Sequence, residues 1–471
     1  MEEKYLSIKT LIYKKLSVIN TEMFAFFLLL LLCFQPLYSV IINVSVLYTR
    51  VALFYSKAVI IRLIGYLGLI IAAIDLYCKC YCFGHKVALK TFFGNMWTGL
   101  LAIVLVLAFI SSLFAQDIYV SFNGDAYRYE GFASYVAYAG IFACASILTN
   151  ESRRRWILKT FVSVSAALAL LTLLKELTGT HIILENGGSI LPYSGTFVNS
   201  NHYGYYLCVS MALAFSLYMD SEKWYYKVLY ATIFSVNTLV LLLNGSFGPY
   251  LAAIAGMILA VIFYIIRKGI KFSWPAVFPI AVLIILSIFI NEGAMLKEIG
   301  KTLGEIVNIF SAIGKGISEG DIGDAISDVN GGSNRFQIWV ATIKVIMDYP
   351  ILGCGTDNVH LIITRYGLSS VEMPHNEYLQ LMANCGILAG IVYITALVWL
   401  LVRSMRNLKK LTPAVLIAGV AAATYALSAF VGVGMTITTC YLFFMLGLTN
   451  SYHQDERIKE LIKANTGSEI A

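Results

Sequence analysis

The stretch MFAFFLLLLLCFQPLYSVIINV, from Met23 to Val44, decides the fold class. As a helix it is long enough to cross the hydrocarbon layer of a bilayer, roughly 30 Å thick, and it carries no charged side chain. Apolar runs of similar length recur along the chain, in which 59% of residues are hydrophobic and 13% are charged. A soluble domain has about twice that charged share, so the sequence predicts an all-α polytopic membrane protein.

The apolar runs predict about twelve transmembrane helices. The first is expected to be retained, because it is too long for the core of a signal peptide and lacks a small-x-small cleavage site. The second is the least regular, since Lys57 and Arg62 enter its first turns. The predicted spans are Met23–Val44, Ala58–Tyr77, Asn95–Ala115, Phe132–Leu148, Ile157–Leu174, Tyr203–Met219, Val228–Leu243, Tyr250–Ile266, Pro275–Ile290, Leu379–Val402, Ala414–Val431 and Met435–Leu448.

The positions of lysine and arginine predict the orientation. Most of the 34 basic residues fall in alternate connecting segments, and such an excess marks cytoplasmic loops. Both termini are therefore expected in the cytoplasm, within a single integral membrane domain over residues 1–471. Asn291–Asn376, the only long polar interruption, is expected outside as one large loop that contains helices. The net charge of +7 follows from the same bias and from attraction to anionic lipid, so membrane lipids, and no nucleic acid, are the expected partners.

The nine cysteines do not form a recognisable disulfide or metal framework. Most lie in predicted spans, and Cys354 is the one in an outer loop. Cys78, Cys80 and Cys82 precede His85 with a C-x-C-x-C-x-x-H spacing, which does not match the common zinc patterns. We therefore predict no metal site and expect free or lipid-modified thiols.

The positions of the ionisable residues distinguish between an ion-coupled transporter and a protein whose site lies at the membrane surface. An ion-coupled transporter usually places acids, bases or broken helices near the bilayer midplane. Here the span interiors are almost free of them, and Asp75, Lys175 and Glu176 lie near span ends. Cations and hydrogen-bonding groups gather instead in the predicted outer segments. That arrangement suits a lipid-linked phosphate whose tail lies in the bilayer.

The large loop has a coarse structure of its own. Apolar residues from Met295 to Phe310 recur at helical spacing, and the Gly/Asp/Ser-rich stretch 314–332 is expected to be a flexible loop. A second helix is expected from an N-cap at Ser333 or Asn334 to Asp348, ended by a Pro and Gly turn.

Arg335 and His375 stand out in this loop. Arg335 falls in the first turn of the second helix, where it either pairs with Asp328 or water, or binds an anionic head group together with helix N–H groups. His375 precedes Asn376, an expected N-cap. His375 is either an interfacial hydrogen-bonding residue or a general base for a sugar hydroxyl.

Four short segments resemble the O-antigen ligase and O-antigen polymerase family of bacterial envelope glycosyltransferases. They are RYEGFASYVAY, GTFVNSNHYGYYL, RFQIWVATIKVIMDYPILGCGTDNV and PHNEYLQLMANCGILAG, in the order that the family shows. The similarity covers roughly residues 128–390. The matching residues are Arg128, Gly131, Gly195, Thr196, Phe197, Asn199, Asn201, Arg335, Trp339, Asp348, Pro350, Gly353, Gly355, His375, Asn376 and Leu379.

The resemblance implies a GT-C-like enzyme in the bacterial cytoplasmic membrane. Such an enzyme transfers glycan from a polyprenyl-diphosphate carrier to a glycan or lipid-linked acceptor, without metal or cofactor, and a flippase or chain-length regulator is an expected partner. His375 would deprotonate or orient the acceptor, while Arg335 would neutralise the diphosphate with Arg128 and Arg365. Asn199, Asn201 and Asn376 would shape the cavity or bind sugar.

One departure keeps the reaction type open. Ligases of the family often show Ser-Arg-Gly or Ser-Arg-Ala after the seventh span, where this chain has Ser246, Phe247 and Gly248. A phosphate contact is thereby missing or is supplied from elsewhere, so a polymerase fits as well as a ligase. A transporter or flippase of lipid-linked sugars and a non-catalytic assembly protein remain the alternatives.

Overall fold

The computed structural model describes residues 21–38, 50–85, 88–89, 96–126, 128–179, 192–197, 199–301, 335–366 and 373–466, and these ranges contain helices, turns and loops but no strand. The first half contains α2 (Glu22–Phe34), η2 (Gln35–Leu37), α4 (Arg50–Phe83), α6 (Met96–Leu113), α7 (Ile118–Asn123), α8 (Phe132–Ile147), α9 (Glu151–Thr178), η3 (Gly195–Phe197) and α10 (Ser200–Asp220). The second half contains α11 (Trp224–Asn244), α12 (Phe247–Lys268), η4 (Ile270–Ala276), α13 (Val277–Phe289), η5 (Ile290–Gly293), α16 (Arg335–Asp348), α17 (Val359–Ile363), η6 (Thr364–Tyr366), α18 (Glu377–Cys385), α19 (Ile387–Arg406), α20 (Pro413–Ser428), η7 (Ala429–Val431) and α21 (Thr436–Thr466).

The helices confirm a multi-pass membrane protein, and their apolarity divides the predicted spans into three groups. Seven described segments are long and apolar enough to cross a membrane: Tyr55–Tyr81, Glu151–Thr178, Trp224–Asn244, Phe247–Lys268, Trp274–Lys301, Ile387–Arg406 and Pro413–Val431. Three shorter apolar helices are Glu22–Leu37, Thr98–Leu113 and Phe132–Ile147. The remaining two predicted spans coincide with α10 and α21, which belong to neither group, so twelve crossings remain a prediction.

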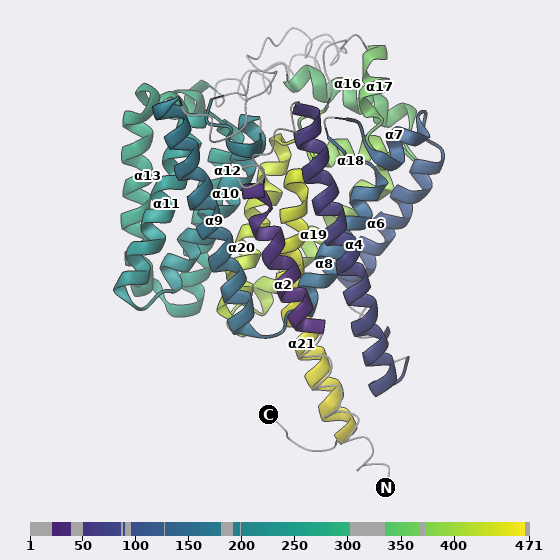
Figure 1. The fold of residues 1–471 in the computed structure, drawn as a ribbon, viewed down its shortest axis with the longest axis horizontal. Coiled ribbons are helices and arrows are strands. Elements are labelled where there is room, and N and C mark those ends of the chain that lie inside the picture. Colours follow the sequence, from purple (N-terminus) through teal and green to yellow (C-terminus); the bar gives the residue numbers. More distant parts are fainter. Residues whose placement is uncertain are drawn as a thin grey trace, which may run out of the picture.

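The low apolarity of α10 has a structural explanation. Every residue from Tyr203 to Met219 is buried, because α10 packs against α11, α12 and α20. Its surface therefore faces other helices, which can be more polar than lipid tails. Figure 1 shows the resulting bundle, with α16, α17 and α18 gathered at one end, which we call the α16 end, and with the last turns of α21 at the opposite end.

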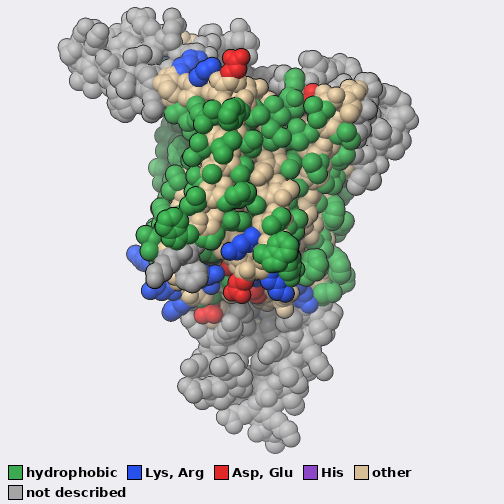
Figure 2. Space-filling model, turned by 90° about the vertical axis from the view of Figure 1, so that its left-hand side faces the viewer, with side chains coloured by type: hydrophobic (Ala, Val, Ile, Leu, Met, Phe, Trp, Pro, Cys, Tyr) green, Lys and Arg blue, Asp and Glu red, His purple; other side chains and the backbone are tan. Residues whose placement is uncertain are grey.

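The wall of the bundle shows the banding expected of a membrane protein. Figure 2 shows hydrophobic side chains over the middle of one face and a belt of Lys and Arg at the end opposite α16. Arg153 and Arg155 belong to that opposite end, where they pair with Glu22 and with Glu151 and Asp220. This agrees with the predicted orientation without testing which side is cytoplasmic.

The predicted span Leu379–Val402 is not one helix, which is a correction to the sequence analysis. α18 ends at Cys385 and α19 begins at Ile387, with Gly386 between them at φ +88°. A Cβ at Gly386 would lie 2.1 Å from the Ile351 carbonyl oxygen, so only glycine fits the break. The sequence missed it because Gly386 stands inside a long apolar run.

The turn that follows α16 satisfies the backbone groups freed by this break. The Cys354 N–H donates to the Ala383 carbonyl at 2.9 Å, and the Ile387 N–H donates to the Pro350 carbonyl at 2.9 Å. Backbone polar groups at membrane depth need such partners. The D-x-P-x-x-G-x-G pattern therefore has a structural role: it docks the end of α16 onto the broken helix.

Parts of the predicted large loop lie outside the described residues. Residues 294–301 are helical, which agrees with the start of the predicted helix from Met295. The rest of that helix, the 314–332 stretch and the N-cap at Ser333 or Asn334 lie outside the described ranges. α16 is described from Arg335 and ends at Asp348, as predicted.

Candidate functional site

Arg335 and His375 come together at the α16 end of the bundle. Arg335 is the first residue of α16, and His375 stands just before α18. Asn376 caps α18 as predicted, since its side-chain oxygen accepts from the N–H groups of Tyr378 and Leu379 at 3.0 and 3.1 Å. This cap assigns Asn376 a structural role beside the histidine and leaves its predicted contact with sugar untested.

The turn before α18 holds His375 in an unusual conformation. His375 has φ +50°, a left-handed value that is uncommon for a residue with a side chain. Met373 and the Asn376 cap on either side are both buried, which keeps the turn in place. Strain of this kind is often found where a side chain must face a site.

Electrostatics keep the His375 imidazole uncharged. Burial lowers the pKa of His375, and the nearby Arg335 guanidinium lowers it further. A neutral imidazole can accept a proton at neutral pH. Within the described residues, no carboxylate lies within ion-pair distance of Arg335, and the predicted partner Asp328 lies outside them. The site therefore combines a cation with a neutral base.

Tyr205 and His202 of α10 border the same region. The Tyr205 hydroxyl donates to the Val431 carbonyl at 2.9 Å, and Tyr205 also lies within electrostatic reach of Arg335 and Glu377. The His202 ring centroid lies 6.4 Å from that of Tyr205. The sequence analysis quoted both residues in one motif but did not identify Tyr205, because a tyrosine in a tyrosine-rich helix carries no distinguishing signal.

The Phe247 segment also borders this region. Phe247 is the first residue of α12, and a Cβ at Gly248 would lie 2.4 Å from the Val431 side chain. Val431 is the residue whose carbonyl accepts from Tyr205. Gly248, next to Phe247, therefore packs against the residue that Tyr205 contacts, and Phe247 itself carries an uncharged ring.

The predicted asparagines lie at the start of α10. Asn199 caps this helix by accepting from the Asn201 N–H at 2.9 Å. The preceding Gly195–Phe197 turn is anchored by Lys57, whose amino group donates to the Thr196 carbonyl and lies 5.0 Å from the centre of the Phe197 ring. Lys57, which makes the start of the second predicted span irregular, therefore holds the Gly195–Phe197 turn in place.

Arg128 is placed in an ion-pair network. Its guanidinium bonds Asp357 at 2.9 Å, pairs with Asp125 at 3.3 Å and lies 3.0 Å from the His360 ring. Asp357 is fully buried and also accepts from the Asp125 N–H at 2.7 Å. These contacts favour a structural role for Arg128, and its predicted contact with diphosphate stays a proposal.

Arg365 lies at the exposed surface of the same end. Its guanidinium donates to the Tyr349 hydroxyl at 3.3 Å and to the Gln116 side chain at 3.1 Å. These contacts are long and exposed, so Arg365 could change partners at little cost. The structure therefore does not bring Arg365 into the Arg335–His375 pair.

The buried carboxyls Glu130 and Glu377 were not anticipated. Glu130 accepts from the Tyr138 hydroxyl at 2.5 Å, and Glu377 accepts from the Tyr425 hydroxyl at 2.9 Å. Both lie outside the candidate spans and are more than nine-tenths buried. Acids in short polar segments usually look exposed in sequence, so neither carried a signal of burial.

Metal-ligating residues do not cluster in the described ranges, where no group of three His, Cys, Asp or Glu side chains could hold an ion. Comparison with known proteins gives one clear result. Residues 231–394 match the family described as O-Antigen ligase, a range that contains Arg335, Arg365, His375 and Asn376. No curated protein matches the chain.

Proposed function

Because the chain belongs to the O-antigen ligase family, we propose that it is a membrane glycosyltransferase acting on a polyprenyl-diphosphate-linked glycan at the outer face of the bacterial cytoplasmic membrane. The observation that carries the proposal is the pairing of Arg335 with a neutral His375. One group suits an anionic leaving group, and the other suits a hydroxyl nucleophile. The family match supports lipid-linked glycan as the substrate class, and the carrier and the reaction are our proposals.

The proposed chemistry is a direct displacement at the anomeric carbon. His375 takes the proton from an acceptor hydroxyl, whose oxygen forms the new glycosidic bond while the bond from the anomeric carbon to the diphosphate oxygen breaks. Arg335 and the N–H groups at the start of α16 stabilise the negative charge that grows on the departing diphosphate. The proton stays on the imidazole until it exchanges with solvent or the leaving group.

The acceptor decides between polymerase and ligase. Both reactions use the same donor chemistry, and the Phe247 segment lacks the arginine that ligases of the family often carry. We propose a polymerase, in which the acceptor is a second glycan chain on the carrier. The ligase remains its nearest alternative, with a lipid-anchored acceptor.

Reconstitution with a lipid-linked donor tests the proposal. His375→Ala and Arg335→Ala should each lower formation of new glycosidic bonds by about 100-fold or more, the range seen when a general base or a charge-stabilising group is removed. Lys344→Ala is the matched control for Arg335, because Lys344 is an exposed cation on the same helix. His85→Ala is the control for His375, because His85 is exposed near the opposite end of the bundle.

Three results would overturn the proposal. The first is full activity in both site variants at equal amounts of inserted protein. The second is carrier movement across proteoliposomes without new glycosidic bonds, which would establish a flippase. The third is the absence of both activities with loss of function only in misfolded variants, which would establish an assembly protein.

A further inference from the structure

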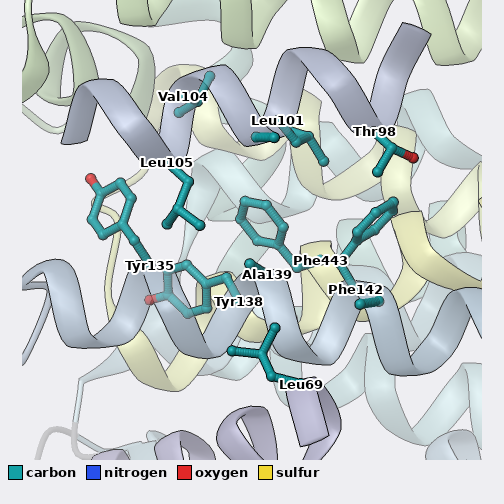
Figure 3. Close-up of a pocket in the computed structure, with 12 residues that line it drawn as sticks. Leu69, Thr98, Leu101, Val104, Leu105, Tyr135, Tyr138, Ala139, Phe142 and Phe443 are labelled. Carbon is teal, nitrogen blue, oxygen red and sulfur yellow. The ribbon is translucent and has the colours of Figure 1, made fainter. Parts of the chain in front are cut away.

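A large apolar cavity lies between α4, α6, α8 and α21, and neither Arg335 nor His375 lines it. It has a volume of about 260 Å³, and Thr98, Leu101 and Leu105 of α6 face Tyr138 and Phe142 of α8 across it. Figure 3 shows Thr98 at one end and Tyr135 at the other, with the Phe443 ring between. Thr98 and Leu105 are seven residues apart on α6, so the cavity is roughly 10 Å long at a helical rise of about 1.5 Å per residue.

A second, smaller cavity adjoins the first toward the α16 end. It has a volume of about 50 Å³ and shares Val104, Tyr135, Tyr138 and Phe443 with the larger one as walls. Its other walls include the carboxyl and amide groups of Glu130, Glu377 and Gln380, whereas the larger cavity has polar groups only in the hydroxyls of Thr98, Tyr135 and Tyr138. The two cavities together form an apolar space with a polar end.

The polar end offers hydrogen bonds that the protein does not use. One oxygen of Glu130 accepts from Tyr138, and one oxygen of Glu377 accepts from Tyr425. Among the described residues, no group donates to the second oxygen of either carboxyl, although both side chains are more than nine-tenths buried. The Glu130 Oε1 atom lies 3.6 Å from where a Cβ on Gly434 would stand, beside the Gln380 amide. Both side chains line the cavity, and polar atoms inside a protein normally have partners, so these oxygens point to a ligand.

The charge of this end decides what kind of head group fits. Burial raises the pKa of Glu377 to about 8 and raises that of Glu130 well above its ordinary value. Burial thus favours the uncharged form of both carboxyls, and an uncharged carboxyl can donate as well as accept. No Lys or Arg of the described ranges forms an ion pair with either. A phosphate head would be desolvated here without a counter-charge, which is costly, whereas a hydroxyl would be satisfied.

The direction of the joined cavities matches that of a lipid. Glu130 precedes α8 and Glu377 begins α18, so the polar end lies toward the α16 end of the bundle. Thr98 stands near the start of α6, at the far end of the apolar part. A lipid of the leaflet at the α16 end has its head and tail in this order. The apolar part holds the first half of one long chain, and because the cavity is partly open, the rest of the chain extends out of it toward the lipid.

We propose that these two cavities form a binding site for one long-chain lipid alcohol, with its hydroxyl between Glu130 and Glu377 and its chain between α6 and α8. Neither Arg335 nor His375 lines these cavities, and the site differs from that pair in charge preference, although Glu377 stands two residues after His375. It does not depend on the proposed transferase activity. Its occupant is an uncharged lipid and not the diphosphate carrier.

Photolabelling of the full-length protein in nanodiscs tests the site. The probe is a hexadecanol that carries a diazirine in its chain, and its phosphate monoester is the comparison. We expect the alcohol to label peptides of α6 and α8, unlabelled hexadecanol to compete, and the phosphate to label at least about fivefold less, as the lost hydrogen bonds and the desolvated charge imply.

Two pairs of variants locate the occupant. Leu101→Trp fills the apolar part and should lower labelling about fivefold or more, whereas Ile103→Trp, on the exposed face of the same helix, should leave it unchanged. Glu130→Gln keeps a hydrogen-bonding head site and should label like the wild type, whereas Glu130→Leu should not. Thermal unfolding in detergent identifies any variant that fails to fold, and the peptide map of the wild type tests the site without any substitution.

Equal labelling by alcohol and phosphate, or equal labelling of Leu101→Trp and Ile103→Trp, would overturn the proposal. The first result would assign the cavity to a charged lipid, and the second would place the probe on the outer wall. Arg335→Ala should label like the wild type. Labelling that persists in a protein without transferase activity would therefore uphold this site while the proposed function fails.

Discussion

The Arg128 guanidinium and the Asp357 carboxylate form a buried ion pair, with 2.9 Å between Nε and Oδ1, across 229 positions of sequence. This pair ties the loop before α8 to the turn before α17. Asp357 also accepts from the backbone N–H groups of Asp125 and Glu130, so one carboxylate organises the whole loop. Burial raises the pKa of Asp357, and the adjacent Arg128 guanidinium opposes that rise.

Asp357→Asn is expected to destabilise the protein by about 3 kcal/mol or more, because it leaves the buried Arg128 without its strongest counter-charge. Thermal unfolding in detergent measures the effect. Asp348→Asn is the control, since Asp348 is exposed and accepts a hydrogen bond from Tyr366. An Asp357→Asn protein as stable as the wild type, with weaker donor binding, would show instead that Arg128 serves the substrate.

The rate of glycan transfer should depend on the protonation of His375. Its folded pKa lies below the ordinary 6.5, so the neutral, proton-accepting form predominates above that pKa. The rate should therefore hold down to pH 6.5 and fall only on further acidification. Arg335→Gln removes the positive charge that lowers the pKa of His375. The loss of activity at low pH, which forms the acidic limb of the profile, should therefore move to higher pH. The pH profile of kcat/KM measures both.

The matched control for this shift is Lys344→Gln, which alters an exposed cation on the same helix and should leave the acidic limb in place. An acidic limb that does not move in Arg335→Gln would mean that the two side chains are too far apart to interact in the membrane.

Gly386→Ala should destabilise the fold by more than about 1 kcal/mol, because alanine does not adopt φ +88° without strain and its Cβ would clash with the Ile351 carbonyl. Gly419→Ala is the control within α20, where the nearest atoms to an added Cβ lie 3.7 Å away. There we expect no loss, or a gain of about 0.5–1 kcal/mol from helix propensity. Equal effects at both positions would argue for a continuous helix through Gly386.

Lys57→Met should loosen the Gly195–Phe197 turn, because the Thr196 carbonyl loses its buried donor, at a cost of about 1–3 kcal/mol. Limited proteolysis near this turn, compared between variant and wild type, measures the loosening. Lys159→Met provides the comparison, since the Lys159 amino group packs over the Tyr226 ring elsewhere on the molecule. An unchanged cleavage pattern in Lys57→Met would show that Thr196 is held by its hydroxyl contact with Pro36 alone.

The sequence predicted those features that depend on local pattern. Apolar runs located the helices, and the Asn376 cap was predicted correctly because a cap needs only its own helix. The Arg128–Asp357 pair could not be predicted, since nothing in either segment identifies its partner. The break at Gly386 was hidden by the hydrophobic residues around it. The burial of Glu130 and Glu377 depends on helices that are far apart in sequence and has no trace in the nearby sequence.

The docking of the α16 turn onto the α18–α19 break has a mechanical consequence. α16 begins at Arg335, and the turn that follows its last residue is hydrogen-bonded to the end of α18, the helix that His375 precedes. The ends of the two helices that lie away from Arg335 and His375 are therefore joined by backbone hydrogen bonds, and the helices also pack against each other. A motion that separates Arg335 from His375 must therefore break this packing or the hydrogen bonds at the joint. The distance between His375, the proton acceptor, and Arg335, the cation, is thus set by backbone hydrogen bonds that involve neither residue.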